Sequence, residues 1–231
     1  MNRSKICLAA IAGLTALGGA SSAFAYTAPN LGSTASFAVL STESGSRGAV
    51  TCTDSTVAGK VGSSGARPAV VATRCSISGG VIAPVAPRNL KDFALASSQI
   101  NTNTCQHILS GTQAGAILAP GVYCFDAAAS LTGTMTLSGP RTGVWIFLVN
   151  GDLTGNSFSV VMGDRGKACN VYWAPSGATT MTTSNAKGTI LAGQAITLTG
   201  GSFEGRAFAG KAVTLTNIAA TTCPTAFLPR R

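Results

Sequence analysis

Two neighbouring stretches near the C-terminal end carry the same pattern of apolar and polar positions. Residues 188–199 read GTILAGQAITLT and residues 205–216 read GRAFAGKAVTLT, so seven of twelve paired positions are identical at a spacing of 17 residues. Each copy ends in an alternation of apolar residues and threonines, which a β-strand places on opposite faces. A short fixed period of this kind is typical of stacked coils that bury their apolar faces against one another.

The rest of the second half follows a similar alternation. After Gly111, a hydrophobic strand, a turn and a Thr-rich strand recur at least five times, and Leu-Thr-Gly occurs at both 131–133 and 153–155. Residues 144–149 are almost continuously apolar, which predicts a strand that is covered on both faces.

One segment breaks this pattern. Residues 88–109 contain no glycine or proline, and their apolar positions recur at spacings of three, four and seven, as on one buried face of a helix. Pro87 stands where a first helical turn tolerates proline. Residues 31–85 read as short strands between glycines, with Val50 and Cys52 pointing inward. The predicted fold is mainly β, a β-solenoid with one long helix over about 88–109 that covers the apolar strand.

The first 25 residues have the make-up of a secretory signal peptide. Arg3 and Lys5 precede an apolar run of small residues, and Ala-Phe-Ala offers a cleavage site before Tyr26. The run is short for a membrane span, which disfavours a signal anchor, and no later stretch is long enough. We predict a signal peptide over 1–25, one domain over 26–231, and a secreted protein that is released or kept at the cell surface or in the periplasm.

The composition narrows the classes of function. Only 10% of the residues are charged, against about 25% in an ordinary domain, and glycine, alanine, serine and threonine fill the gap. The formal net charge is +9, but the basic residues are scattered singly apart from the last two, and none alternate with aromatic residues. Nucleic-acid binding therefore has little support.

Six of the seven cysteines remain after removal of the predicted signal peptide. An even count in an exported protein indicates disulfides, although six cysteines allow 15 pairings. A zinc site is disfavoured because no C-x-x-C spacing occurs and His107 is the only histidine. We expect sequential pairs: Cys52 with Cys75, Cys105 with Cys124, and Cys169 with Cys223.

Candidate catalytic residues form no recognisable motif. His107 lies in the predicted helix, and no G-x-S-x-G sequence is present. Asp152 with Asp164, or Asp126 with Glu204, could pair as glycosidase carboxylates, and β-solenoids do host polysaccharide-cleaving enzymes. The acids are too few, however, and none lies in a motif, so we predict no enzymatic activity.

Threonines form the recurring polar pattern of the predicted strands. Side by side, such strands would form a flat two-column grid, with rows about 4.7–4.9 Å apart and columns about 6.6–6.8 Å apart. Stiff, uncharged side chains on such a grid could order water on a lattice that merges with ice. The alternative is scaffolding, because threonine favours strands and Thr–Thr pairs stabilise sheets. The ten outward positions are Thr132, Thr134, Thr154, Asn156, Thr180, Thr182, Thr197, Thr199, Thr214 and Thr216.

Several stretches resemble the bacterial and microbial-eukaryote ice-binding family that has a discontinuous right-handed β-solenoid fold. The resemblance implies a triangular solenoid, a long helix packed along one side, and coils stacked out of sequence order. It also implies that the partner is ice and that no cofactor or metal is needed. The likeness follows the family's order over nearly the whole mature chain, at residues 30–40, 118–125, 131–134, 168–173, 188–192 and 205–215.

One region departs from the family's pattern. Residues 42–56 lack the usual Thr/Asn/Gly-rich stretch and hold Cys52, and residues 63–78 are also charged. If the ice-binding face uses these coils, their charges would interrupt its uncharged surface. The charged residues concerned are Glu43, Arg47, Asp54, Arg67 and Arg74.

The sequence thus leaves two readings from different classes. We predict a monomeric, secreted ice-binding protein that inserts into no membrane and needs no cofactor. The alternative is an adhesive or structural β-solenoid without ice activity that binds components of the cell surface.

Overall fold

The computed structural model describes residues 26–45 and 47–223, so the predicted signal peptide lies outside the described residues. The described chain is mainly β, with one 18-stranded sheet whose strands all pair in parallel, and a single α-helix, α1 (Pro87–Asn101). No helix in this part of the chain is long and apolar enough to cross a membrane. The strands are β1 (Phe37–Ser41), β2 (Val50–Thr53), β3 (Thr56–Ala58), β4 (Lys60–Ser63), β5 (Val70–Thr73), β6 (Ser76–Ile77), β7 (Val81–Ile82), β8 (His107–Ile108), β9 (Ile117–Leu118), β10 (Gly121–Phe125), β11 (Ala129–Gly139), β12 (Trp145–Val149), β13 (Leu153–Asp164), β14 (Val171–Pro175), β15 (Thr179–Ala192), β16 (Ile196–Ala209), β17 (Val213–Thr216) and β18 (Ala219–Thr221).

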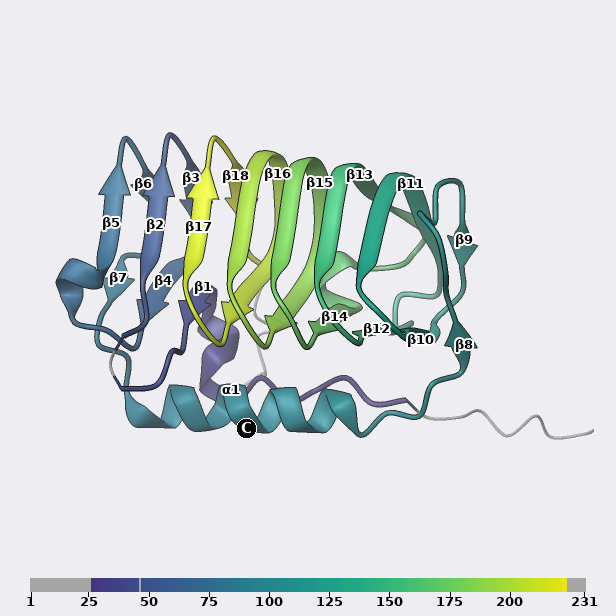
Figure 1. Cartoon of the computed structure of the whole chain (residues 1–231), viewed down its shortest axis with the longest axis horizontal. Helices are drawn as coiled ribbons and strands as arrows, with labels where there is room; N and C mark the ends of the chain where they lie inside the picture. Colours follow the sequence, from purple (N-terminus) through teal and green to yellow (C-terminus); the bar gives the residue numbers. More distant parts are fainter. Residues whose placement is uncertain (1–25, 46, 224–231) are drawn as a thin grey trace, which may run out of the picture.

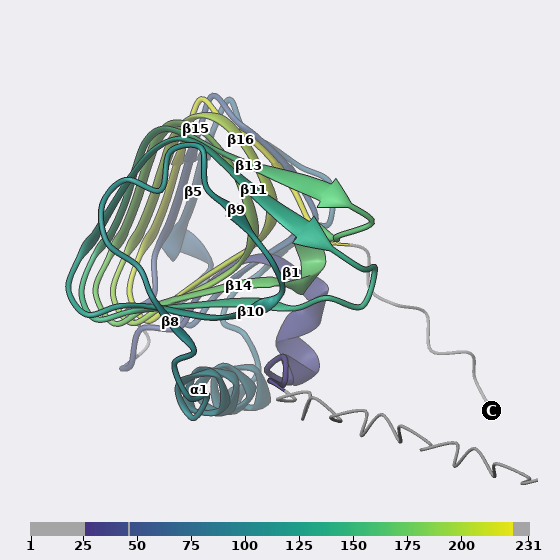
Figure 2. The ribbon, with the colours of Figure 1, turned by 90° about the vertical axis from the view of Figure 1, so that its right-hand side faces the viewer.

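The sheet winds into stacked coils with a triangular cross-section, which Figure 2 shows end on. The threonine face consists of β5, β2, β17 and the first parts of β16, β15, β13 and β11, which lie side by side across the front of Figure 1. The helix face, beside α1, consists of β7, β4, β1, the ends of β16 and β15, and β14, β12, β10 and β8. The remaining parts form the third face.

The coils do not stack in the order of the chain. β17, near the C-terminal end, pairs with β2, and β16 pairs with β1, so the two halves of the chain meet inside the sheet. After β7 the chain passes into α1, which runs back along the helix face to the opposite end, where β8 pairs with β10 (Figure 1). The β-solenoid with coils out of sequence order is therefore confirmed.

The helix face is buried on both sides, as the apolar run over 144–149 predicts. Phe147 of β12 packs in the cluster inside the solenoid, whereas its neighbour Ile146 packs in a second cluster with Ala96 and Ile100 of α1. All four side chains are buried. The helix thus covers a sheet face that would otherwise expose a row of large apolar residues.

The helix is shorter than predicted, because α1 ends at Asn101 and not near residue 109. The next three residues are Thr-Asn-Thr, which favour local bonds to the backbone over helix; Asn103 Nδ2 donates to the Ile100 carbonyl at 2.9 Å. Cys105 is then bonded to Cys124 of β10, and β8 begins two residues later. The disulfide and the strand pairing together draw the chain out of the helical path.

The three disulfides join the sequential pairs. Each bridges elements that lie close in the stack but apart in the chain, and the Cα–Cα distances are within the range of ordinary disulfides. The last one anchors the end of the described chain to the turn before β14. The pairs are Cys52–Cys75 (5.8 Å), Cys105–Cys124 (5.9 Å) and Cys169–Cys223 (5.5 Å).

Candidate functional site

On the threonine face, the outward side chains of seven neighbouring strands align in two columns. The register is continuous where the halves of the chain meet: Thr197 pairs with Thr214, and Thr214 pairs with Thr51. Between the columns, inward residues such as Leu198 and Cys52 lie in the core. We call these fourteen outward positions the threonine grid. In order along the solenoid, the first column is Ser130, Thr154, Thr180, Thr197, Thr214, Thr51 and Val71, and the second is Thr132, Asn156, Thr182, Thr199, Thr216, Thr53 and Thr73.

Every row of the grid ends at the same kind of corner. The residue after the second column has a positive φ in all seven coils, which turns the strand toward the third face. The repeated turn limits each row to two outward side chains and keeps the rows aligned. The corner residues and their φ angles are Gly133 (69°), Ser157 (49°), Thr183 (49°), Gly200 (67°), Asn217 (52°), Asp54 (50°) and Arg74 (48°).

The grid is uncharged, and its polar groups are free to meet water. Its members are threonines apart from Ser130, Asn156 and Val71. Among the described residues, the structure records no hydrogen bond from a grid side chain to any other protein group. Threonine is stiff at χ1, so each hydroxyl and methyl keeps a fixed direction. The grid therefore presents a regular, rigid pattern of donors, acceptors and methyl groups.

The third face has a different character. Its side chains bond to one another along the stack: Ser202 Oγ donates to Asn185 Oδ1 at 2.8 Å, and Asn185 Nδ2 donates to Ser159 Oγ at 3.3 Å. Lys187 and Glu204 form an ion pair on neighbouring rows of the same face. Part of its polar surface is thus bonded within the face, and its charges would order water differently from row to row.

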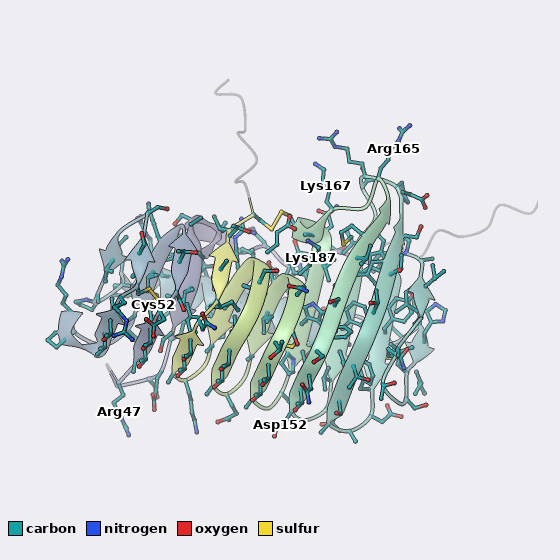
Figure 3. All side chains as sticks on the ribbon, turned by 90° about the horizontal axis from the view of Figure 1, so that it is seen from above. Arg47, Cys52, Asp152, Arg165, Lys167 and Lys187 are labelled. Carbon is teal, nitrogen blue, oxygen red and sulfur yellow. A yellow bond between two sulfur atoms is a disulfide. The ribbon has the colours of Figure 1, made fainter. Side chains whose placement is uncertain are left out.

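The charges of the N-terminal half do not enter the grid. Asp54 and Arg74 occupy two of the corners and pair with each other, with Arg74 Nη2 donating to Asp54 Oδ2 at 2.7 Å, and this partner lowers the pKa of the Asp54 carboxyl. Figure 3 shows Arg47 and Asp152 projecting at one margin of the molecule and Lys167 at the opposite one. Within the described residues, no three His, Cys, Asp or Glu side chains lie close enough together to hold a metal ion.

Nine of the ten face residues expected from the sequence lie in the grid, and Thr134 does not. Thr134 follows the corner at Gly133 and pairs with Ser159 on the third face. The position beside Thr154 belongs instead to Ser130. In β11 the expected outward pair, Thr132 and Thr134, therefore lies two residues further along the chain than the observed pair, Ser130 and Thr132.

The sequence prediction also missed the part of the grid that the N-terminal half supplies. The alternation over 49–53 marked two of these residues as outward, but nothing local placed β2 beside β17. That pairing joins segments from opposite ends of the chain. The missed members are Thr51, Thr53, Val71 and Thr73.

The fold and the grid together define a class of protein: a discontinuous, triangular β-solenoid with one uncharged, threonine-lined face. A family model described as ice-binding-like matches residues 12–221. The chain belongs to this ice-binding-like family.

Individual relatives agree with this assignment. An ice-binding protein from Flavobacterium frigoris (strain PS1) is 30% identical over 182 residues, which cover 71% of this chain and 64% of the relative. The chain thus spans less than two thirds of that protein. The crystal structure of an ice-binding protein from the Antarctic ascomycete Antarctomyces psychrotrophicus matches with a TM-score of 0.75 at 26% identity, over 86% of this chain and 100% of the other. That of an ice-binding protein from an Antarctic bacterium of the Flavobacteriaceae matches with a TM-score of 0.77 at 28% identity, over 87% and 48%.

Proposed function

We propose that this chain is a secreted ice-binding, antifreeze protein that adsorbs to ice through the threonine grid and inhibits ice growth and recrystallisation. The observation that carries the proposal is the continuous register of seven rows, which repeats two outward side chains at one spacing along the whole solenoid. Family membership and relatives named as ice-binding proteins support it. Because one chain completes the grid, we propose that a monomer is active.

The physical argument rests on many weak contacts that act together. A threonine hydroxyl can donate one hydrogen bond and accept others, and its methyl excludes liquid-like water beside it. One such contact with an ordered water is weak. The rows are fixed about 4.7–4.9 Å apart, however, so once one threonine contacts ice its neighbours are held beside the ice surface at high effective concentration. The whole grid therefore dissociates from ice very slowly.

The test is a bulky substitution at the centre of the grid. Thr197 lies on β16, which has three strands of the threonine face on either side. We expect Thr197→Tyr to abolish thermal hysteresis and ice-crystal shaping, because the ring holds the neighbouring rows away from the ice lattice. The measurement is the gap between melting and freezing points of the purified, oxidised protein, with the crystals viewed under a microscope.

Thr221→Tyr is the matched control, because Thr221 is exposed on the third face. It should keep the wild-type hysteresis, and both variants should unfold at the wild-type temperature. A folded wild-type protein without hysteresis would defeat the proposal, and the threonines would then serve as scaffold.

Export is the second part of the proposal. Three disulfides are typical of a protein that folds in an oxidising compartment, which supports secretion. N-terminal sequencing of the exported protein should begin at Tyr26, and gel filtration should give the mass of one chain; a retained leader or a stable dimer would contradict these parts.

A further inference from the structure

A groove of about 1290 Å³ opens at one end of the solenoid, away from the threonine grid. It lies where the N-terminal segment, the C-terminal end of α1 and β8 meet, at the right-hand end of α1 in Figure 1. Among the described residues, no aspartate, glutamate, lysine or arginine lines it, and cleavage before Tyr26 would place the free α-amino group of the mature chain in the lining. Its polar lining includes Tyr26, Asn30, Gln99, Gln106 and His107, together with Asn103 and nearby threonines.

Three carboxamides of the groove are held by their oxygen ends. Asn30 Oδ1 accepts a bond from the Gly32 N–H at 2.9 Å, Gln99 Oε1 from the Asn30 N–H at 2.8 Å, and Gln106 Oε1 from the Val122 N–H at 2.9 Å. These bonds fix each amide and leave its NH₂ group, which has two donors, without a recorded partner among the described residues. The groove therefore offers fixed hydrogen-bond donors without formal charge.

Two rings border the same groove. Tyr26 is half-buried at its edge, and the His107 ring stacks on Tyr123, with ring centroids 5.0 Å apart. The disulfide between Cys105 and Cys124 ties the segment that carries His107 to β10. The His107 ring thus lies on a braced segment, and the Tyr26 ring lies on the N-terminal segment that lines the same groove.

We propose that this groove binds a neutral oligosaccharide. The C–H face of a sugar packs on aromatic rings, and its hydroxyl oxygens accept bonds from the amide NH₂ groups. An anionic ligand would find no lysine or arginine side chain in the lining, only the α-amino group that cleavage would free at Tyr26. An apolar ligand would leave the amide donors unpaired at a cost. The volume exceeds the roughly 300–1,000 Å³ of a typical small-molecule site, which favours several sugar units over one. The site is separate from the grid, so the proposal stands apart from ice binding.

Isosteric variants test the amide donors. Gln99→Glu and Gln106→Glu keep an oxygen for the backbone N–H bond but replace the NH₂ donor with a second oxygen. Calorimetric titration would use maltohexaose, cellohexaose and laminarihexaose as neutral probes, and an alginate hexamer as a charged comparison. We expect at least one neutral probe to bind, and each variant to weaken its binding about fivefold or more, the loss of one hydrogen bond.

Gln194→Glu is the matched control, because it adds the same charge in a turn outside the groove and should bind like wild type. A readout without any variant comes from His107, the only histidine of the chain, whose ring signals should shift during titration with the bound probe. The proposal fails if no neutral hexamer binds at millimolar concentration, if only alginate binds, or if binding moves neither the His107 signals nor the affinities of the two variants.

Discussion

The three non-threonine side chains of the grid all lie in its outer rows. Ser130 and Asn156 belong to β11 and β13 at one end, and Val71 belongs to β5 at the other. The four inner rows, on β15, β16, β17 and β2, hold threonine in both columns. An inner side chain has ordered neighbours on both sides, so the position of a substitution should matter as much as its chemistry.

Thr183 is the one β-branched residue among the seven corners, and its φ of 49° strains such a side chain. Asn217 takes the equivalent corner of β17 with a φ of 52°. We expect Thr183→Asn to raise the free energy of unfolding by roughly 1 kcal/mol, because asparagine enters the left-handed region more easily. Chemical denaturation measures the change.

The same substitution at Thr221, which lies in a strand, should not stabilise the protein. Because Thr183 lies outside the grid, thermal hysteresis should stay at the wild-type level in Thr183→Asn. A variant of equal or lower stability would show that the corner tolerates threonine without strain.

At the scale of elements, hydrogen bonds dock α1 on the short 3-10 helix η1 (Gly32–Ser36). The Asp92 carboxylate accepts bonds from Ser33 Oγ at 2.6 Å and from the Ser33 N–H at 2.7 Å, and Asn89 Nδ2 donates to the same Oγ at 2.8 Å. Bonds to the charged form lower the pKa of Asp92 in the folded protein, the side-chain bond from Ser33 most of all.

This cluster predicts a pH dependence of stability. An Asp with a lowered folded pKa stabilises the fold above its unfolded pKa of about 3.9, and the contribution is lost as the pH falls below that value. Asp92→Asn should therefore be less stable than wild type at pH 6, and the gap should close toward pH 2. Melting temperatures at pH 6, 4, 3 and 2 measure this.

Asp54 also has a lowered pKa, but it is present in both proteins, so the difference between the two curves isolates Asp92. Asp126→Asn, which removes a carboxylate without a recorded hydrogen bond, is the control and should follow the wild-type curve. Parallel curves for wild type and Asp92→Asn down to pH 2 would rule out this role of the carboxylate.

The elements were largely predictable from sequence because their signals are local. Alternation marked the strands, and the apolar run over 144–149 predicted a strand buried on both sides. The error at Thr134 came from continuing the alternation of inward apolar and outward polar residues past Gly133, where the strand turns a corner. The two Leu-Thr-Gly copies do not align either, because the register pairs Leu131 with Gly155. A repeated tripeptide is thus a weaker guide to register than the corner that follows each row, since the corner fixes where outward positions stop.

At the scale of the whole molecule, two separate halves of the chain build one grid. Arg206 is buried at their junction and donates to the Ala35 carbonyl at 3.0 Å and to the Cys223 carbonyl at 3.1 Å. It thereby joins the N-terminal segment to the end of the described chain. No periodicity in the sequence could reveal this order, because the contact between β17 and β2 is not between successive coils.

Because both halves of the chain contribute to the grid, a substitution in the N-terminal half should affect ice binding as much as one in the C-terminal half. Thr51 lies in the N-terminal half but is the neighbour of Thr214 in the first column. If ice meets all seven rows at once, Thr51→Tyr should reduce thermal hysteresis severalfold, close to the effect of Thr214→Tyr, because each ring disturbs the same pair of rows. Thr56→Tyr, on the third face of the same coil, is the control and should leave hysteresis unchanged at equal melting temperature. Full hysteresis in a folded Thr51→Tyr variant would confine ice contact to the C-terminal coils and leave the N-terminal coils as a cap on the sheet.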